Sequence, residues 1–234
     1  MTHELPLSQH DILNAQECAR ARDQVIALRD RWTSRSDGGG FFTLGAAAYL
    51  DAPNRHASYL DAAKARNPTL RRSFDWLYER VRRFFEEFFG EAAFFDHQYA
   101  MPGFHIFVLN GRDRSRDNPA ARAHFDLQWM AAMPGRAPSE ALSFTLLVEE
   151  PSGGASMAIW SVRYQDGVRR GFSAVDYASR HAPQTVTYAR GRIVVHDGFI
   201  LHAIGRSHAD APEGLRITLQ GHGVRSPRGW LLYW

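Results

Sequence analysis

The sequence predicts an α+β protein in which a double-sheet jelly roll or cupin-like barrel is supported by N-terminal helices. Apolar residues recur at helical spacing through residues 1–93, and from residue 94 onward short candidate strands alternate with turn signals. Strands at this spacing are typical of a double-sheet jelly roll. Because the helices precede the strands, we expect a single domain in which helices pack on an outer sheet.

Two amphipathic patterns predict the main helices. Asn14 followed by Glu17 indicates a capping box, and apolar residues recur at helical spacing after it. A second, stronger pattern runs from Leu70 to Phe88 and ends near Gly90. A short helix is also expected over residues 59–66. The polar face of the second pattern carries arginine and glutamate, which we expect to be solvated and paired along the helix.

The second part of the chain predicts the jelly-roll core. Turn signals separate eight candidate strands: 103–109, 123–129, 142–149, 156–162, 184–188, 192–196, 199–204 and 215–222. Residues 161–183 are the least regular, and we expect an insertion or a lid over the barrel mouth. The expected organisation is therefore helical support over 1–93, a core over 94–225 and an aromatic tail over 226–234. Such a tail would cover the barrel mouth or lie in a homodimer contact.

Composition narrows the class of protein. The chain has 234 residues, 44% of them hydrophobic and 23% charged, which is typical of a globular protein. Its net charge is only +3, and no block of basic residues indicates nucleic-acid binding. Lys64 is its only lysine, so nearly all of the positive charge is arginine. Cys18 is the only cysteine, which excludes an intrachain disulfide and fits a reducing cytoplasm. With no membrane helix or signal peptide in the pattern, we expect a cytoplasmic protein that binds a small molecule.

One short motif indicates a metal site. His124, Phe125 and Asp126 form an HxD sequence on a candidate strand, and His202 lies on a distant apolar strand. Two imidazoles and one carboxylate are the ligand set of a mononuclear non-haem iron site with open coordination positions. Since side chains two apart on a strand point the same way, the histidine and the aspartate share one face. Gln128 would join that row, close to the metal.

A second candidate exists for the second histidine ligand of the metal site. His202 follows the turn Asp197-Gly198 within an apolar run, whereas His196 precedes that turn. The turn interrupts the strand between them and favours His202. His208, in a polar loop, and His222 are weaker alternatives.

These residues resemble the Fe(II)/2-oxoglutarate-dependent dioxygenase superfamily, particularly its prolyl-hydroxylase-like branch. The matching segments are 124–126, 153–160, 192–202 and 216–218, together with an early helix segment at 14–18. The resemblance implies a double-stranded β-helix that uses Fe(II), O₂ and 2-oxoglutarate. It also implies hydroxylation of an unactivated C–H bond, with release of succinate and CO₂.

The resemblance also assigns roles to residues. His124, Asp126 and His202 would hold the iron. Arg216 would form a bidentate pair with the distal carboxylate of 2-oxoglutarate, and Thr218 would add a hydroxyl hydrogen bond.

This chain departs from the family at one place. The gap between His202 and Arg216 is a few residues longer than usual, the loop 207–214 absorbs the difference, and Arg206 is the alternative anchor. Residues 101–107 and 126–129 also look like a subgroup that acts on free amino acids and includes halogenases. In a halogenase a small residue replaces the carboxylate of the motif and makes room for chloride. Because Asp126 is present, hydroxylation of an amino acid or a related metabolite is expected.

Four further side chains are candidates for substrate contact: Gln128, His105, Trp129 and His222. His105 either packs against a hydrophobic wall or touches the substrate. His222 shares strand parity with Arg216 and would line the pocket, whereas Trp129 faces away from Gln128, as core residues do. Four arginines precede the HxD motif and would either bind a substrate anion or form a solvated loop: Arg112, Arg114, Arg116 and Arg122.

Two other functions are compatible with this pattern. One is a member of the same superfamily that acts on nucleic acid or protein, for which the arginine-rich loop is the only support. The other is a non-catalytic, cupin-like metal-binding sensor. A sensor would not need the cosubstrate arginine, Arg216, so we favour the enzyme.

Overall fold

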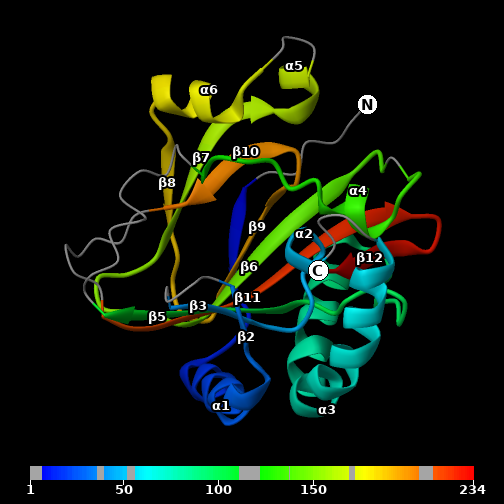
Figure 1. Ribbon diagram of the computed structural model, residues 1–234, viewed down its shortest axis with the longest axis vertical. Coiled ribbons are helices and arrows are strands. Elements are labelled where there is room, and N and C mark those ends of the chain that lie inside the picture. The colour runs from blue at the N-terminus through cyan, green and yellow to red at the C-terminus, as the bar shows by residue number, and fades with distance from the viewer. Residues whose placement is uncertain are drawn as a thin grey trace.

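A computed structural model of the protein describes residues 7–35, 40–51, 56–110, 122–136, 138–168, 172–205 and 213–234. In this part of the chain, two sheets stand between helices at opposite ends of the molecule (Figure 1). The strands are β1 (Ser8–Asp11), β2 (Thr33–Ser34), β3 (Phe41–Leu44), β4 (Ala93–Phe95), β5 (Gly103–Asn110), β6 (Ala141–Glu149), β7 (Ser156–Arg163), β8 (Gln184–Thr187), β9 (Arg192–Asp197), β10 (Ile200–Ile204), β11 (Glu213–Ser226) and β12 (Gly229–Tyr233). The helices are α1 (Ala15–Ala27), α2 (Ala48–Asp51), α3 (His56–Phe89), α4 (Gln128–Ala132), α5 (Tyr164–Val168) and α6 (Ala174–Arg180), with a 3-10 turn at Arg29–Arg31.

The larger sheet has the order β1-β9-β6-β11-β5-β3-β2, and β12 joins it by pairing with both β11 and β4. The smaller sheet has the order β10-β7-β8. The strand pairs of the described residues are antiparallel except for β12 and β4, which run parallel. The mixed α+β class predicted from the sequence is confirmed.

The N-terminal helices follow the predicted patterns, with one difference. The capping box of α1 is present, because the side chains of Asn14 and Glu17 each accept a hydrogen bond of 2.9 Å from the other's backbone N–H. The two helices expected over 59–66 and 70–88 are one helix, α3, with Pro68 inside it and a kink at Phe74. A continuous buried stripe on α3 explains why the proline does not end it, since packing overrides local propensity. Gly90 follows the helix with φ 67°, a favoured way to end one.

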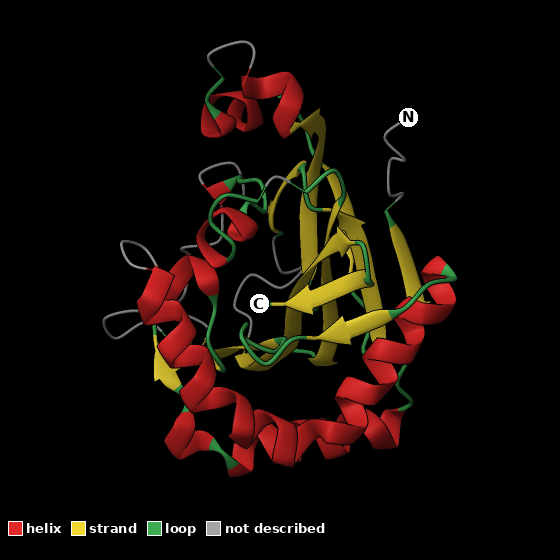
Figure 2. Cartoon of the chain, turned by 90° about the vertical axis from the view of Figure 1, so that its right-hand side faces the viewer, coloured by secondary structure: helices red, strands yellow, loops and turns green. Residues whose placement is uncertain are grey.

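The helices α1 and α3 cover one face of the larger sheet, as Figure 2 shows. Alternate residues of β6 point to opposite faces of the larger sheet. Leu142, Phe144 and Leu146 pack in the core with the helices, whereas Ser143 and Thr145 point to the other face. The core side is apolar and buried, which provides the main stabilisation. The other face is partly polar and looks toward the smaller sheet, so it is here that a site can be built.

Two segments differ from the sequence prediction, and a third contains helices that the prediction did not specify. Residues 123–129 do not form a strand, because only His124 pairs with β10 and the chain then turns into α4. The tail 226–234 contains β12, which is a strand of the larger sheet, with Trp230 and Trp234 buried within this chain. The irregular stretch 161–183 contains α5 and α6, which stand at the end of the molecule opposite α1 and α3 (Figure 2).

The short strands β1 to β4 were not predicted. Each has four residues or fewer and a weak alternation of its own, so its pairing depends on partners that are distant in sequence. None of the helices in the described ranges is long and apolar enough to cross a membrane.

Candidate metal and cosubstrate site

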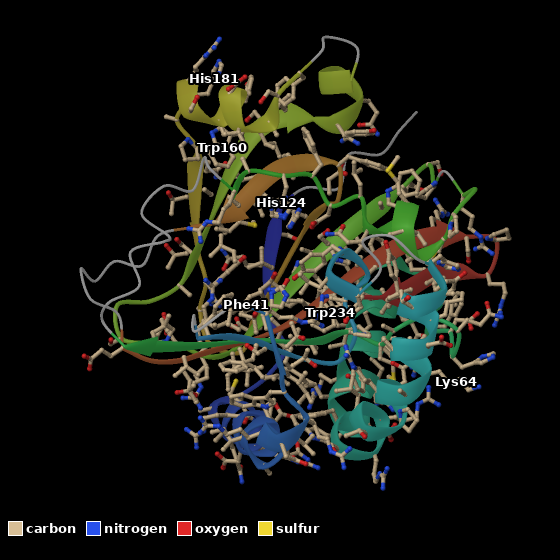
Figure 3. All side chains as sticks on the ribbon, in the orientation of Figure 1. Phe41, Lys64, His124, Trp160, His181 and Trp234 are labelled. Atoms are coloured by element: carbon tan, nitrogen blue, oxygen red, sulfur yellow. The ribbon has the colours of Figure 1, made fainter. Side chains whose placement is uncertain are left out.

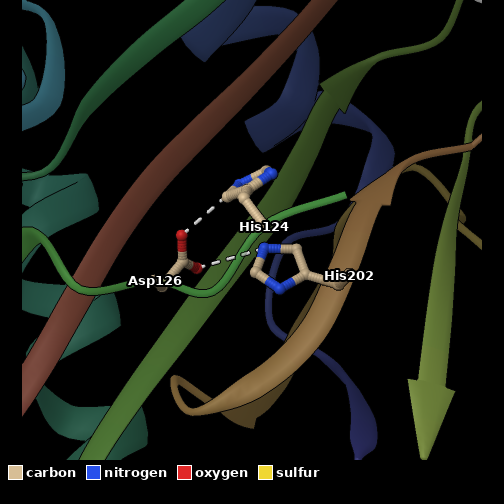
Figure 4. Close-up of side chains that lie close together, drawn as sticks. All are labelled: His124, Asp126 and His202. Carbon is tan, nitrogen blue, oxygen red and sulfur yellow. Dashed lines mark ion pairs between the residues drawn. The ribbon is translucent and has the colours of Figure 1, made fainter. Parts of the chain in front are cut away.

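Three predicted ligands converge in the interior between the sheets (Figure 4). The nearest donor atoms of His124, Asp126 and His202 all lie within 4.8 Å of one another. Nε2 of His124 is 3.6 Å from Oδ1 of Asp126, and Nε2 of His202 is 3.2 Å from Oδ2. Asp126 and His202 are buried, whereas the side chain of His124 is 50% exposed, so the cluster opens to solvent on that side. Figure 3 shows His124 near the centre of the molecule, between the two ends that the helices occupy.

The main chain holds both histidines in place. His124 and His202 exchange two backbone hydrogen bonds of 2.9 and 3.0 Å, although their positions are far apart in sequence. Nδ1 of His124 lies 2.8 Å from the carbonyl oxygen of Arg122, and Nδ1 of His202 lies 3.0 Å from that of Ile200. A carbonyl only accepts, so each Nδ1 carries the proton. In the neutral form of each imidazole the lone pair is therefore on Nε2, directed at the cluster, as a metal ligand requires.

Asp126 is held in its ionised form. Burial alone would raise its pKa, but the charges of His202 and His222, the hydrogen bond with His202 and the charge of His124 lower the pKa well below its usual range. Conversely, burial lowers the pKa of His202, yet Asp126 outweighs burial and raises it. Two histidine nitrogens and one carboxylate, all close to one point, fit Fe(II) in a non-haem site with open positions. A bound cation would replace the proton that joins His202 to Asp126, and both side chains would then bind the cation.

His196 does not join this cluster. It is buried on β9, its Nδ1 lies 2.9 Å from the carbonyl oxygen of Asp197, and its ring lies 4.6 Å from that of His202. Burial, followed by the charge of His202, lowers its pKa to about 3. The geometry therefore favours His202 as the second histidine. His208 lies outside the described residues.

Arg216 lies on the same interior, on β11. It is 4% exposed, its Nε has no hydrogen-bond partner, and it forms no ion pair with a carboxylate in the described part of the chain. Its guanidinium carbon lies 5.8 Å from the ring centroid of Phe107 and 5.4 Å from that of Tyr188. Burial lowers its pKa, although arginine stays charged in proteins. A buried cation among aromatic rings is suited to an anionic ligand.

Thr218 is adjacent to Arg216 on the same face of β11. Its hydroxyl oxygen accepts a 3.0 Å hydrogen bond from Nε2 of Gln220, whose Oε1 in turn accepts one of 3.0 Å from Thr145. The hydroxyl proton of Thr218 is then available to a ligand carboxylate. Arg206, the alternative anchor, lies outside the described residues.

The other predicted substrate residues separate into two groups. Gln128, His105 and His222 face the interior: Nε2 of Gln128 donates a 2.9 Å hydrogen bond to Asp126, and Nδ1 of His222 lies 3.8 Å from it. Trp129 packs in an apolar cluster and lines a separate surface cavity of about 370 Å³, together with residues such as Val224.

The structure adds two residues that the sequence did not indicate. Tyr49 on α2 hydrogen-bonds Nε2 of His105 at 2.5 Å, and Tyr188 flanks Arg216. Tyr49 carries no motif, whereas Tyr188 lies at the end of a predicted strand. Of the arginine-rich loop only Arg122 is described, and its carbonyl oxygen orients His124.

Comparison with known proteins supports the fold. No protein-family model and no curated protein matches the sequence. An N-substituted L-amino acid dioxygenase from Burkholderia ambifaria AMMD, solved with alpha-KG, matches with a TM-score of 0.59 and 16% identity, over 97% of this chain and 85% of that one. The non-heme alpha ketoglutarate dependent carbocyclase SnoK from nogalamycin biosynthesis matches with a TM-score of 0.55 and 12% identity, over 99% and 93%. AviO1 from Streptomyces viridochromogenes Tue57 gives 0.53 and 14%, over 97% and 92%.

At these identities the similarity establishes the fold, which is one that 2-oxoglutarate-dependent non-haem oxygenases use. This similarity of fold agrees with the resemblance found in the sequence. His124, Asp126 and His202 add a ligand set of the kind that this class of site requires.

Proposed function

We propose that this protein is an Fe(II)- and 2-oxoglutarate-dependent oxygenase, built on a double-stranded β-helix, that oxidises a C–H bond of a small molecule. The observation that carries the proposal is the convergence of His124, Asp126 and His202, in the same interior as a buried arginine without a carboxylate partner among the described residues. Iron with O₂ and 2-oxoglutarate supplies an oxidant strong enough for an unactivated C–H bond, with release of succinate and CO₂.

The residues of the chain bind and orient the reactants. Nε2 of each histidine and a carboxylate oxygen of Asp126 would hold the metal. Arg216 would pair with the distal carboxylate of 2-oxoglutarate through two parallel N–H donors, and Thr218 would donate its hydroxyl proton to the same group. The rings of Phe107 and Tyr188 lie beside the guanidinium and would limit the access of water to this pair, which would strengthen it.

We further propose that the substrate is an amino acid or a related metabolite and that the outcome is hydroxylation. Support for the substrate comes from the N-substituted L-amino acid dioxygenase that shares the fold. Support for hydroxylation comes from Asp126, because a halide would need the coordination position that this carboxylate takes.

Two measurements test the proposal. Anaerobic addition of Fe(II) and then 2-oxoglutarate should give a weak visible charge-transfer band. An aerobic screen over amino acids and their derivatives should find compounds that stimulate release of succinate. The proposal is wrong if the protein gives neither the band nor any succinate, whereas binding of metal without either signal would favour the sensor.

A further inference from the structure

Only one of the two polar atoms in the side-chain amide of Gln128 has a hydrogen-bond partner. Gln128 is 8% exposed, its Nε2 donates to Oδ1 of Asp126 at 2.9 Å, and its Oε1 has no hydrogen-bond partner. The orientation of this amide follows from chemistry, because a metal-binding carboxylate is ionised and can only accept. The nitrogen must therefore face Asp126, and the oxygen must face elsewhere.

We propose that Oε1 of Gln128 accepts a hydrogen bond from the substrate, so that the site selects molecules with an N–H or O–H donor near the carbon that is oxidised. This inference rests on the proposed function and adds a specificity determinant to it.

The position of the amide places this contact beside the metal. The oxygen and the nitrogen of one amide are about 2.2 Å apart. Oε1 of Gln128 therefore lies no more than about 5 Å from Oδ1 of Asp126, given the 2.9 Å hydrogen bond between them. A donor bound there belongs to the part of the substrate that approaches the metal.

An aromatic residue, Tyr49, lies on the helix α2, which packs against the helix that Gln128 begins. The helix α2 packs against α4 and presents Tyr49, which is exposed on one side and hydrogen-bonded to His105 on the other. Asp51 anchors α2, because it accepts hydrogen bonds from the guanidinium groups of Arg35 and Arg66 and from the backbone N–H of Ala47.

A buried acceptor without a donor is costly, and the cost sets the expected selectivity. Leaving such a group unsatisfied costs about 1–3 kcal/mol, which corresponds to a factor of about 5 to 150 in binding. A substrate that supplies the donor should bind more tightly by this factor than its methylated analogue.

The experiment uses three pairs of probes with the anaerobic Fe(II)–2-oxoglutarate complex of the full chain. The pairs are L-leucine and N,N,N-trimethyl-L-leucine, N-acetyl-L-leucine and N-acetyl-N-methyl-L-leucine, and 2-hydroxy- and 2-methoxy-4-methylpentanoate. They distinguish an amine, an amide and a hydroxyl donor. Titration of the visible band gives a dissociation constant for each member, and aerobic succinate release provides a second measurement.

In the wild type, at least one donor-bearing probe should bind about 5 to 150 times more tightly than its partner. In Gln128→Met the ratio within that pair should fall to about one, even if both members bind less well because Asp126 has lost a hydrogen bond. Gln220→Met is the matched control, since both amide atoms of Gln220 are already bonded within the protein, and it should keep the wild-type ratio.

Equal binding within every pair, or an unchanged ratio in Gln128→Met, overturns the inference. So does a complex whose band forms but responds to no probe. These results leave the proposed function standing, whereas failure to form the band at all refutes the proposed function itself.

Discussion

Replacing Arg216 by methionine is expected to stabilise the protein on its own and to abolish cosubstrate binding. Arg216 is 4% exposed, its Nε has no hydrogen-bond partner, and it forms no ion pair with a carboxylate among the described residues. Methionine would fill a similar volume without a buried charge, and replacing buried ionic groups by apolar ones often stabilises by about 1–4 kcal/mol. The two aromatic neighbours favour the cation, so we expect the low end, about 1–2 kcal/mol.

For a chain of this size that gain raises Tm by roughly 2–8 °C. Adding 2-oxoglutarate should instead favour the wild type, because it is expected to stabilise the wild type and not Arg216→Met. At a concentration a hundred times its Kd, 2-oxoglutarate stabilises the wild-type metal complex by about 2.7 kcal/mol. Removing one partner of a buried charge pair costs about 2–5 kcal/mol, so this stabilisation should disappear in Arg216→Met.

The assay is thermal unfolding of the anaerobic Fe(II) form, with and without 2-oxoglutarate. Arg225→Met is the control, because Arg225 is 46% exposed and pairs at the surface with Glu91 and Glu140. It should retain the full shift in Tm. A large loss of stability in Arg216→Met without cosubstrate, or a retained shift, would refute the role of Arg216 as an anion anchor.

Three other predictions follow from the site and the core. Asp126→Ala should lose tight binding of a divalent metal in calorimetry while His196→Gln keeps it, and equal losses would contradict the ligand assignment. Burial would raise the pKa of Asp51, but its arginine and backbone hydrogen bonds hold the pKa below the ordinary value of 3.8. The carboxylate therefore stabilises the fold above that pH, and the difference in urea midpoint between wild type and Asp51→Asn should shrink as the pH falls through the lowered pKa. Cys18 is buried and burial raises the pKa of its thiol, so a disulfide reagent should react only after unfolding, and rapid labelling of the native protein would contradict this.

Much of the fold could be predicted because its signals are local. The capping box at Asn14 and the strand expected over 142–149 each depend on a few neighbouring residues, and the structure contains both. The prediction of a strand over 123–129 was wrong. The alternation of residue types cannot show that only His124 of this segment pairs with another strand. The role of the tail 226–234 depends on β11 and β4, which are distant in sequence.

The candidate site follows the same rule. His124, Asp126 and His202 could be predicted because their types and order carry the chemistry, and the structure brings them together. Tyr49 could not be predicted, because its relevance depends on the packing of α2 beside His105.

The paired backbones of His124 and His202 have one further consequence. Because their amides and carbonyls bind each other directly, trimming either imidazole should leave the peptide scaffold around the vacancy in place. The half-exposed position of His124 could then be refilled by free imidazole from solution, whereas the buried position of His202 should resist such chemical rescue. Rescue of His124→Gly but not of His202→Gly would show that the polypeptide, and not the metal, sets the shape of the centre.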